Sequence, residues 1–149
     1  MYILLKCYHI HLIHPFFKSL RKELTKMPKL CFQDLGFRNS LLNQWQYPDQ
    51  RLDKGQNIEN FLFIRLRQLY GMDSLRYWKT SGGNEIDFIV TPNTGGDFAM
   101  ESKFKADSLN PSKYKIFTNA YPEIPLRLVA YSFTIFPTLT LRSSITLMM

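Results

Sequence analysis

Cysteines are scarce in this sequence, acidic residues are few, and long apolar runs are absent. The two cysteines among the 149 residues are Cys7 and Cys31. Both lie in apolar, strand-like contexts, so we predict buried, reduced thiols in a cytosolic protein. No stretch reaches the ~20 apolar residues of a membrane helix, and Lys6 and the three histidines interrupt the apolar N-terminus, which argues against a signal peptide. We therefore expect a cytoplasmic protein with no membrane partner.

Acidic residues are outnumbered by basic ones. The sequence has 12 Asp and Glu against 19 Lys and Arg, which gives a formal net charge of +7. This balance favours a polyanionic partner, most commonly nucleic acid. Internal repeats and low-complexity segments are also absent, and 149 residues is the length of one domain. A hydrophobic fraction of 45%, with 12 Phe and 8 Tyr, is sufficient for a real core.

The stretch from Asn84 to Phe104 is the most informative part of the chain. Apolar and polar residues alternate on both sides of a turn-forming break at 91–96, which predicts two half-buried strands joined as a hairpin. In each strand the apolar side chains are expected to share one face: Ile86, Phe88 and Val90 in the first, and Phe98, Met100 and Phe104 in the second. The opposite faces carry Glu85 and Asp87, and Glu101 and Lys103, respectively. Pairing the strands can therefore bring Asp87, Glu101 and Lys103 together on one surface.

Asp87, Glu101 and Lys103 suit the chemistry of a divalent-metal hydrolase. Two carboxylates can hold a hard cation, and a lysine can orient or activate a water molecule. The spacing also has a simpler interpretation, because Glu-x-Lys pairs are common on exposed strand faces, where a solvated ion pair contributes little. The residues alone leave both interpretations open.

Other segments predict helices and strands around this hairpin. The strongest is a helix from Lys54 to Tyr70, whose apolar residues recur at helical spacing. Asp53 and Gln56 resemble a capping box at its start, and Asp34 is the expected cap of a shorter helix, Leu35 to Leu42. Strands are expected at Cys7 to Ile13, Lys29 to Gln33, Leu75 to Thr80 and Leu126 to Phe133, and a short helix is expected after Asn110 and Pro111.

Two histidines fall in the first of these strands. His9 and His11 would lie on the same side of it, which suggests a zinc site. No third ligand of a fitting type is nearby in the sequence, so a polar strand face is the preferred interpretation.

From Lys54 onward the expected order is helix, three meandering strands, helix and strand. With Glu59 on the first helix, Asp87 on the second strand and Glu101-Ser102-Lys103 on the third, the chain resembles the PD-(D/E)XK nuclease superfamily. More specifically, it resembles the nuclease-like C-terminal region of predicted bacterial and archaeal AAA-type ATPases, a domain family of unknown function. The similarity runs from about Tyr8 to Tyr131. The residues that carry it are Lys22–Lys29, Asp34–Asn39, Glu59–Phe61, Tyr77–Thr80, Gly83–Phe88 and Glu101–Phe104.

The resemblance implies an α/β fold with a restriction-endonuclease-like core, in which helices flank a central mixed sheet in the order α-β-β-β-α-β. It implies three parts: a strand and helix extension at 1–53 that packs on the core, the core at 54–133, and a tail at 134–149 of uncertain structure. The Gly-x-x-x-x-Gly-Lys-Ser/Thr phosphate loop is absent, as are the ATPase and winged-helix regions that precede this domain in such relatives. The chain therefore looks like an excised domain or a truncated gene. Ile86 stands where the superfamily's name has proline, which is harmless for metal binding.

For function, the resemblance implies a deoxyribonuclease that depends on Mg²⁺ or Mn²⁺. Asp87 and Glu101 would hold the metal ion, with Glu59 supporting it directly or through water. Lys103 would position the attacking water and stabilise the charge that develops in the transition state. The alternative is a non-catalytic module of the same fold, which binds nucleic acid or serves as the partner of an AAA-type ATPase domain or subunit.

Overall fold

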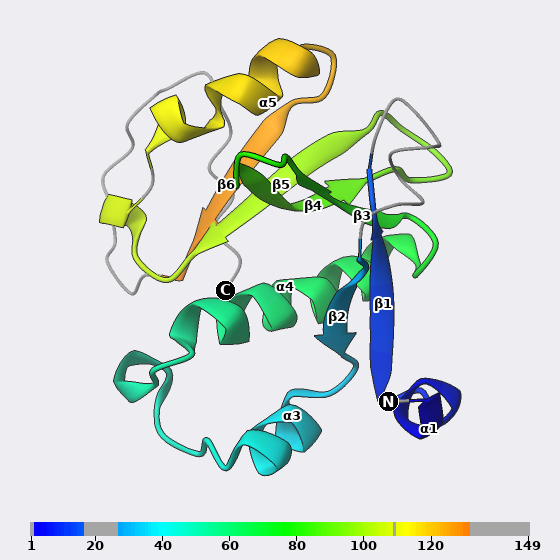
Figure 1. Ribbon diagram of the computed structural model, residues 1–149, viewed down its shortest axis with the longest axis vertical. Helices are drawn as coiled ribbons and strands as arrows, with labels where there is room; N and C mark the ends of the chain where they lie inside the picture. Colours follow the sequence, from blue (N-terminus) through cyan, green and yellow to red (C-terminus); the bar gives the residue numbers. More distant parts are fainter. Residues whose placement is uncertain (1, 17–26, 109, 132–149) are drawn as a thin grey trace.

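A mixed sheet flanked by helices forms the protein (Figure 1). The computed structural model describes residues 2–16, 27–108 and 110–131. Within them the sheet has six strands in the order β2-β1-β3-β4-β5-β6, which confirms the predicted α/β class with a central mixed sheet. The helices are α1 (Tyr2–Lys6), α3 (Leu35–Leu42), α4 (Lys54–Tyr70) and α5 (Lys115–Ala120), and the 3₁₀ turns are η1 (Pro48–Gln50), η2 (Ala106–Ser108) and η3 (Pro111–Tyr114). The strands are β1 (Ile10–Pro15), β2 (Lys29–Phe32), β3 (Leu75–Lys79), β4 (Glu85–Val90), β5 (Phe98–Lys103) and β6 (Leu126–Ala130).

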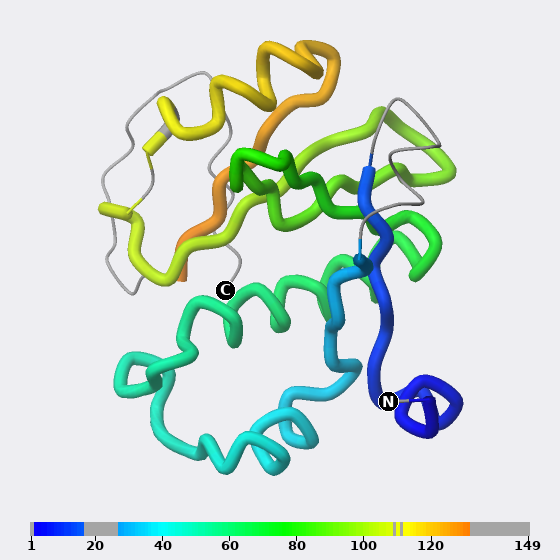
Figure 2. Tube along the Cα trace, viewed as in Figure 1, coloured from blue at the N-terminus to red at the C-terminus, as the bar shows by residue number. Residues whose placement is uncertain are grey.

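Antiparallel and parallel pairs combine in this sheet. Strands β3, β4 and β5 form an antiparallel meander at its centre. Strand β6 lies parallel to β5, which requires a crossover connection, and η2, η3 and α5 lie within it. On the other side, β1 lies parallel to β3 and antiparallel to β2. The tube in Figure 2 shows that α4 and α5 lie on opposite faces of the sheet.

Two hydrophobic clusters attach these helices to the two faces. On the α4 face, Leu62, Phe63 and Leu66 pack against side chains of four strands: Ile13, Leu75, Tyr77, Phe88, Val90, Phe98 and Met100. On the α5 face, Phe117 and Tyr121 pack against Trp78, Ile86, Ile89 and Ala99. Each large apolar side chain that is fully buried contributes roughly 1.5–3 kcal/mol to folding. The sheet is therefore held from both sides, as expected for a layered α/β domain.

A β-bulge in β4 changes which side chains share a face. Arg76 lies opposite Ile89, whereas Trp78 lies opposite Ile86, so two residues of β4 face the single residue Tyr77. As a result Ile86 packs with Ile89 on the α5 face, while Phe88 belongs to the cluster on the α4 face. The prediction that Ile86 shares a face with Phe88 and Val90 is wrong, because strict alternation assumes an unbroken ladder.

The N-terminal segment also differs from expectation. The strand predicted from Cys7 is wrong in its first part, because residues 2–6 form α1 and the chain turns before β1 begins at Ile10. The turn is closed by bonds such as Cys7 N–H to the Ile3 carbonyl, at 2.8 Å, and Tyr8 adopts a left-handed φ of 59°. Cys7 is consequently exposed, contrary to the predicted buried thiol, whereas Cys31 is buried as predicted.

The histidines do not form a zinc site in the described part of the chain. His9 stacks on Phe37 with ring centroids 4.4 Å apart, and His11 stacks on Phe63 at 5.9 Å. Among the described residues, no group of three His, Cys, Asp or Glu side chains is arranged to hold a metal ion. Both histidines instead serve as packing partners of aromatic rings.

The two predicted helices, α3 and α4, are present. The predicted cap of α3 is also present, but that of α4 is not. Asp34 caps α3 as expected, since its carboxylate accepts a hydrogen bond of 2.6 Å from Phe37 N–H. Helix α4 has the predicted bounds, but Asp53 makes no side-chain capping bond. The capping box is therefore wrong, because the carboxylate of Asp53 is taken by Arg38 and Arg51.

Some predictions fall outside the described residues. Strand β6 ends at Ala130, and the predicted continuation to Phe133 and the tail at 134–149 are not described. Residues 22–26 of the first resemblance motif are also outside. Within the described residues, no helix has the length and apolar character needed to cross a membrane.

Candidate functional site

The predicted site residues of the hairpin lie where β4 and β5 separate. Ladder pairing of the two strands runs from Val90↔Phe98 to Phe88↔Met100. Beyond Phe88 and Met100, the backbone N–H groups of Asp87 and Ser102 donate to side-chain carboxylates. Asp87 N–H donates to Glu101 Oε2 at 3.2 Å, and Ser102 donates to Asp87 Oδ2 from its N–H at 2.8 Å and from its hydroxyl at 2.7 Å. The carboxylates of Asp87 and Glu101 are therefore neighbours in the gap between the strands.

Glu101 is the most enclosed member of this group. It is 3% exposed, against 9% for Asp87. Its Oε1 accepts hydrogen bonds from Lys103 Nζ and from the hydroxyl of Tyr114, the latter at 3.2 Å. Lys103 also donates to the Ser102 carbonyl at 3.1 Å. The structure thus brings Asp87, Glu101 and Lys103 together, as the sequence pattern predicts.

Glu59 lies on α4 and faces a different cation. Lys29 Nζ, from β2, donates to Glu59 Oε1 at 2.7 Å and lies 2.8 Å from Glu85 Oε1. Sequence reasoning placed Lys29 in a strand without a role in the site. The signal that would have found it is its phase: Lys29 and the buried Cys31 are two residues apart in β2 and so share a face.

The four carboxyl groups of this region crowd one another. Burial, followed by the charge of Asp87, raises the pKa of both Glu59 and Glu101 above the usual value. Burial alone would lower the pKa of Lys29, but the negative charges of Glu59 and Asp87 outweigh the burial and hold this pKa above the usual value. Burial and then Glu101 raise the pKa of Tyr114, so its hydroxyl stays a donor. The raised pKa values of Glu59 and Glu101 indicate negative charge that the nearby lysines only partly compensate. At Glu85 burial is outweighed by the hydrogen bonds from Lys29 and Lys79, which lower its pKa.

Comparison with known proteins gives a family without an assigned activity. Residues 54–140 match the family described as a domain of unknown function, DUF4143. The chain belongs to the DUF4143 family. No curated protein and no solved structure matches this chain. Glu59, Asp87, Glu101 and Lys103 lie within the part that the family covers, whereas Lys29 precedes it.

The oxygen atoms of the DUF4143 site fit a hard divalent cation in chemistry. Asp87 Oδ2 is engaged by Ser102, but Asp87 Oδ1 accepts no hydrogen bond from the described residues. Glu101 Oε2 accepts one bond and keeps room for a second. Two such oxygens suit Mg²⁺, which commonly uses one or two carboxylates and several waters.

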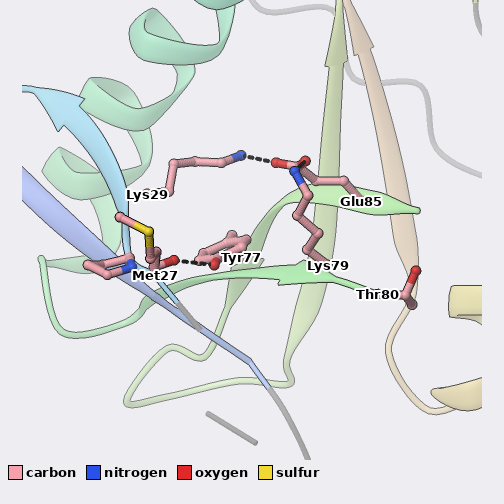
Figure 3. A pocket seen from close by; sticks show the side chains of 7 residues that line it. Met27, Lys29, Tyr77, Lys79, Thr80 and Glu85 are labelled. Carbon is pink, nitrogen blue, oxygen red and sulfur yellow. Dashed lines mark hydrogen bonds and ion pairs between the residues drawn. The ribbon is translucent and has the colours of Figure 1, made fainter. Parts of the chain in front are cut away.

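An open pocket of about 450 Å³ reaches Lys29 and Glu85 (Figure 3). Its lining residues come from β2, β3, β4, the segment before β2 and the turn after β3: Met27, Pro28, Lys29, Tyr77, Lys79, Thr80 and Glu85. The hydroxyl of Tyr77 donates to the Met27 carbonyl at 2.6 Å and so ties the start of this segment to β3. Asp87, Glu101 and Lys103 do not line the pocket, which therefore gives access to Lys29 rather than to the carboxylate pair.

Proposed function

We propose that this DUF4143 protein is a nuclease that hydrolyses phosphodiester bonds of DNA with the help of Mg²⁺ or Mn²⁺. The observation that carries the proposal is the pair of adjacent carboxylates, Asp87 and Glu101, in the gap between β4 and β5, with Lys103 bonded to Glu101. Two acidic ligands beside a lysine are the groups that metal-assisted phosphodiester hydrolysis requires. The net charge of +7 supports DNA as the substrate, because basic residues bind its phosphate backbone.

Each residue of the site has a separate role in this proposed reaction. Asp87 Oδ1 and Glu101 Oε2 would hold the ion, whereas Glu59 is bonded to Lys29. When bound, such an ion supplies Lewis-acid activation of the phosphate and of a water molecule. Lys103 Nζ would orient that water and stabilise the negative charge that develops on the phosphoryl oxygens. The hydroxyl of Tyr114 and the amide of Asp87 fix the carboxylate of Glu101 while this happens.

The fold around the site supports a restriction-endonuclease-like core as part of the proposal. From α4 onward the chain passes through β3, β4 and β5 before α5 and β6. Glu59 lies on the first of these elements, Asp87 on the middle strand of the meander, and Glu101 with Lys103 on the third strand. This distribution is the one that the resemblance to PD-(D/E)XK nucleases implies.

A non-catalytic role is the second candidate, and one observation favours it. Lys29 pairs with Glu59 and Lys103 with Glu101, so two of the three proposed acidic residues already have a cation. In that case the same surface would bind nucleic acid, or an AAA-type ATPase domain or subunit, without cleaving a bond.

Calorimetric titration with Mg²⁺ and Mn²⁺, combined with cleavage of a labelled DNA duplex, separates the two candidates. Asp87→Asn should abolish ion binding and cleavage. Lys103→Met should abolish cleavage but not ion binding, because the lysine acts at the transition state. The matched control is Lys113→Met, which changes an exposed lysine of η3 and should cleave normally. No binding at millimolar metal, or binding that survives Asp87→Asn, would refute the nuclease.

A further inference from the structure

Lys29 is the most buried cation of the site region and has no role in the mechanism above. Its side chain is 17% exposed, against 27% for Lys103 and 47% for Lys79. Its ammonium group lies between two carboxylates, 2.7 Å from Glu59 Oε1 and 2.8 Å from Glu85 Oε1. The rings of Tyr77 and Phe88 lie beside it, with centroids 5.4 and 5.8 Å from Nζ. The two ion pairs and the two aromatic rings together fix the position of the Lys29 ammonium group.

A metal cation could take the position of the Lys29 ammonium group. Two carboxylate oxygens from different elements, α4 and β4, converge on the ammonium of Lys29. A divalent ion put in its place would begin with two hard oxygen ligands, as Mg²⁺ and Mn²⁺ prefer. The pocket in Figure 3 opens onto Lys29 and Glu85, so water molecules could complete the coordination. The side chain of Lys29 thus occupies what would otherwise be a second ion site.

Charge balance supports a single ion. The carboxylates of Glu59, Glu85 and Glu101 pair with the ammonium groups of Lys29, Lys79 and Lys103. Asp87 adds a fourth carboxylate, which leaves one negative charge. One divalent ion would change this to one positive charge, which a phosphodiester group neutralises. A second divalent ion would leave three positive charges before substrate arrives, a large local excess.

We propose that Lys29 is a positioning residue which holds Glu59 and Glu85 and fills the place of a second cation, so that the site binds one divalent ion at Asp87 and Glu101. The inference rests on the proposed function and deepens it, since it assigns Glu59 to Lys29 rather than to the ion. It also gives the segment before residue 54, outside the family match, a part in the site: β2 delivers the lysine.

The number of Mn²⁺ ions bound per chain, measured by calorimetry and by electron paramagnetic resonance, tests this. The wild-type protein should bind about one ion and Lys29→Met about two, because removal of the ammonium exposes both oxygens to the metal. Lys29→Arg, which keeps the charge, and Lys79→Met, which removes a charge from the outer side of Glu85, should each bind one. Two ions in the wild type, or one ion with unchanged affinity in Lys29→Met, would overturn the role of Lys29 alone. Absence of binding in the wild type would overturn the proposed function as well.

A second variant covers the case in which Lys29→Met does not fold. Glu59→Gln keeps an oxygen acceptor for Lys29 and removes the charge. If Glu59 faces Lys29 and not the ion, the Kd for Mn²⁺ should stay within about threefold of the wild-type value. Even indirect partners of a bound metal typically change its affinity by about 10- to 100-fold. A loss of tenfold or more would therefore place Glu59 at the ion and refute the inference.

Discussion

Replacement of Asp53 by asparagine should destabilise the protein by about 2 kcal/mol at neutral pH, and the effect should vanish in acid. Asp53 lies between η1 and α4, the helix that carries Glu59. Its Oδ1 accepts a hydrogen bond of 2.9 Å from Arg51, and its Oδ2 accepts bonds of 2.6 Å from Arg38 and 3.0 Å from Arg51. The two arginines are 5% and 3% exposed, so Asp53 is the neutralising partner of two buried charges.

The size of the effect follows from the pKa of Asp53. Hydrogen bonds from Arg51 and then from Arg38 outweigh the opposing burial and lower this pKa from 3.8 to about 2. A shift of this size corresponds to about 2 kcal/mol of stability at neutral pH, since each unit is worth about 1.4 kcal/mol. Loss of one partner from a buried ion pair can cost about 3–5 kcal/mol. The value of about 2 kcal/mol from the pKa of Asp53 is therefore the lower of the two figures for the loss of stability.

The sign of the pH dependence is fixed by the direction of the shift. Because the pKa of Asp53 is lower in the folded protein than in the unfolded chain, its stabilisation is complete above about pH 5 and is lost as the pH falls through about 2. Protonated Asp53 resembles asparagine in shape and charge. The difference between wild type and Asp53→Asn should therefore shrink between about pH 4 and about pH 2.

Urea unfolding of both proteins at several pH values measures this difference. Other carboxyl groups titrate in both proteins, so the difference between the two isolates Asp53. Asp49→Asn, the same change at an exposed position of η1, is the control and should cost less than about 0.5 kcal/mol. A difference between wild type and Asp53→Asn that is constant from pH 7 to pH 2 would refute the reasoning.

Two further predictions concern Tyr114 and the cysteines. Tyr114→Phe removes the hydroxyl that donates to Glu101 Oε1 and should weaken Mn²⁺ binding, measured by calorimetry, by about tenfold. The unfolding temperature should change little, because the buried ring stays in place. Equal Mn²⁺ affinity would show that the hydroxyl does not orient the carboxylate. In the folded protein a thiol reagent should react quickly with exposed Cys7 and only on unfolding with Cys31, whose pKa burial raises to about 12, so Cys7→Ser should remove the fast reaction and Cys31→Ser should not.

Features with a local cause could be predicted from the sequence. Helix α4 has the predicted bounds because its apolar residues repeat at helical spacing and because Gly71 takes a positive φ of 83° that ends it. The cap at Asp34 depends on a bond only three residues away. The adjacency of Asp87 and Glu101 follows from the antiparallel register of two strands joined by one turn, in which Phe88 pairs with Met100. In each case the pattern that decides the structure lies within one continuous stretch of the chain.

Features with a distant cause could not be predicted. Asp53 and Gln56 match a capping box, but Arg38 competes for the carboxylate from 15 residues away and forms a charged bond that is stronger than a cap. The place of Ile86 depends on a bulge that only the pairing with β3 reveals. Lys29 meets Glu59 across 30 residues. Its phase with the buried Cys31 indicates which face of β2 it shares, but not which residue it contacts.

The arrangement of charges indicates why an ordinary network of ion pairs is an incomplete account of this site. Glu59, Glu85 and Glu101 each have a lysine within hydrogen-bonding distance. Asp87 differs, because among the described residues its partners are the amide and hydroxyl of Ser102, and no lysine or arginine forms a salt bridge with it. Its charge raises the pKa of both Glu59 and Glu101. Groups perturbed by burial and by a like charge are more common at functional sites than elsewhere. The ion pairs of this network do not use the carboxylate at position 87, whereas an ion-binding site needs it.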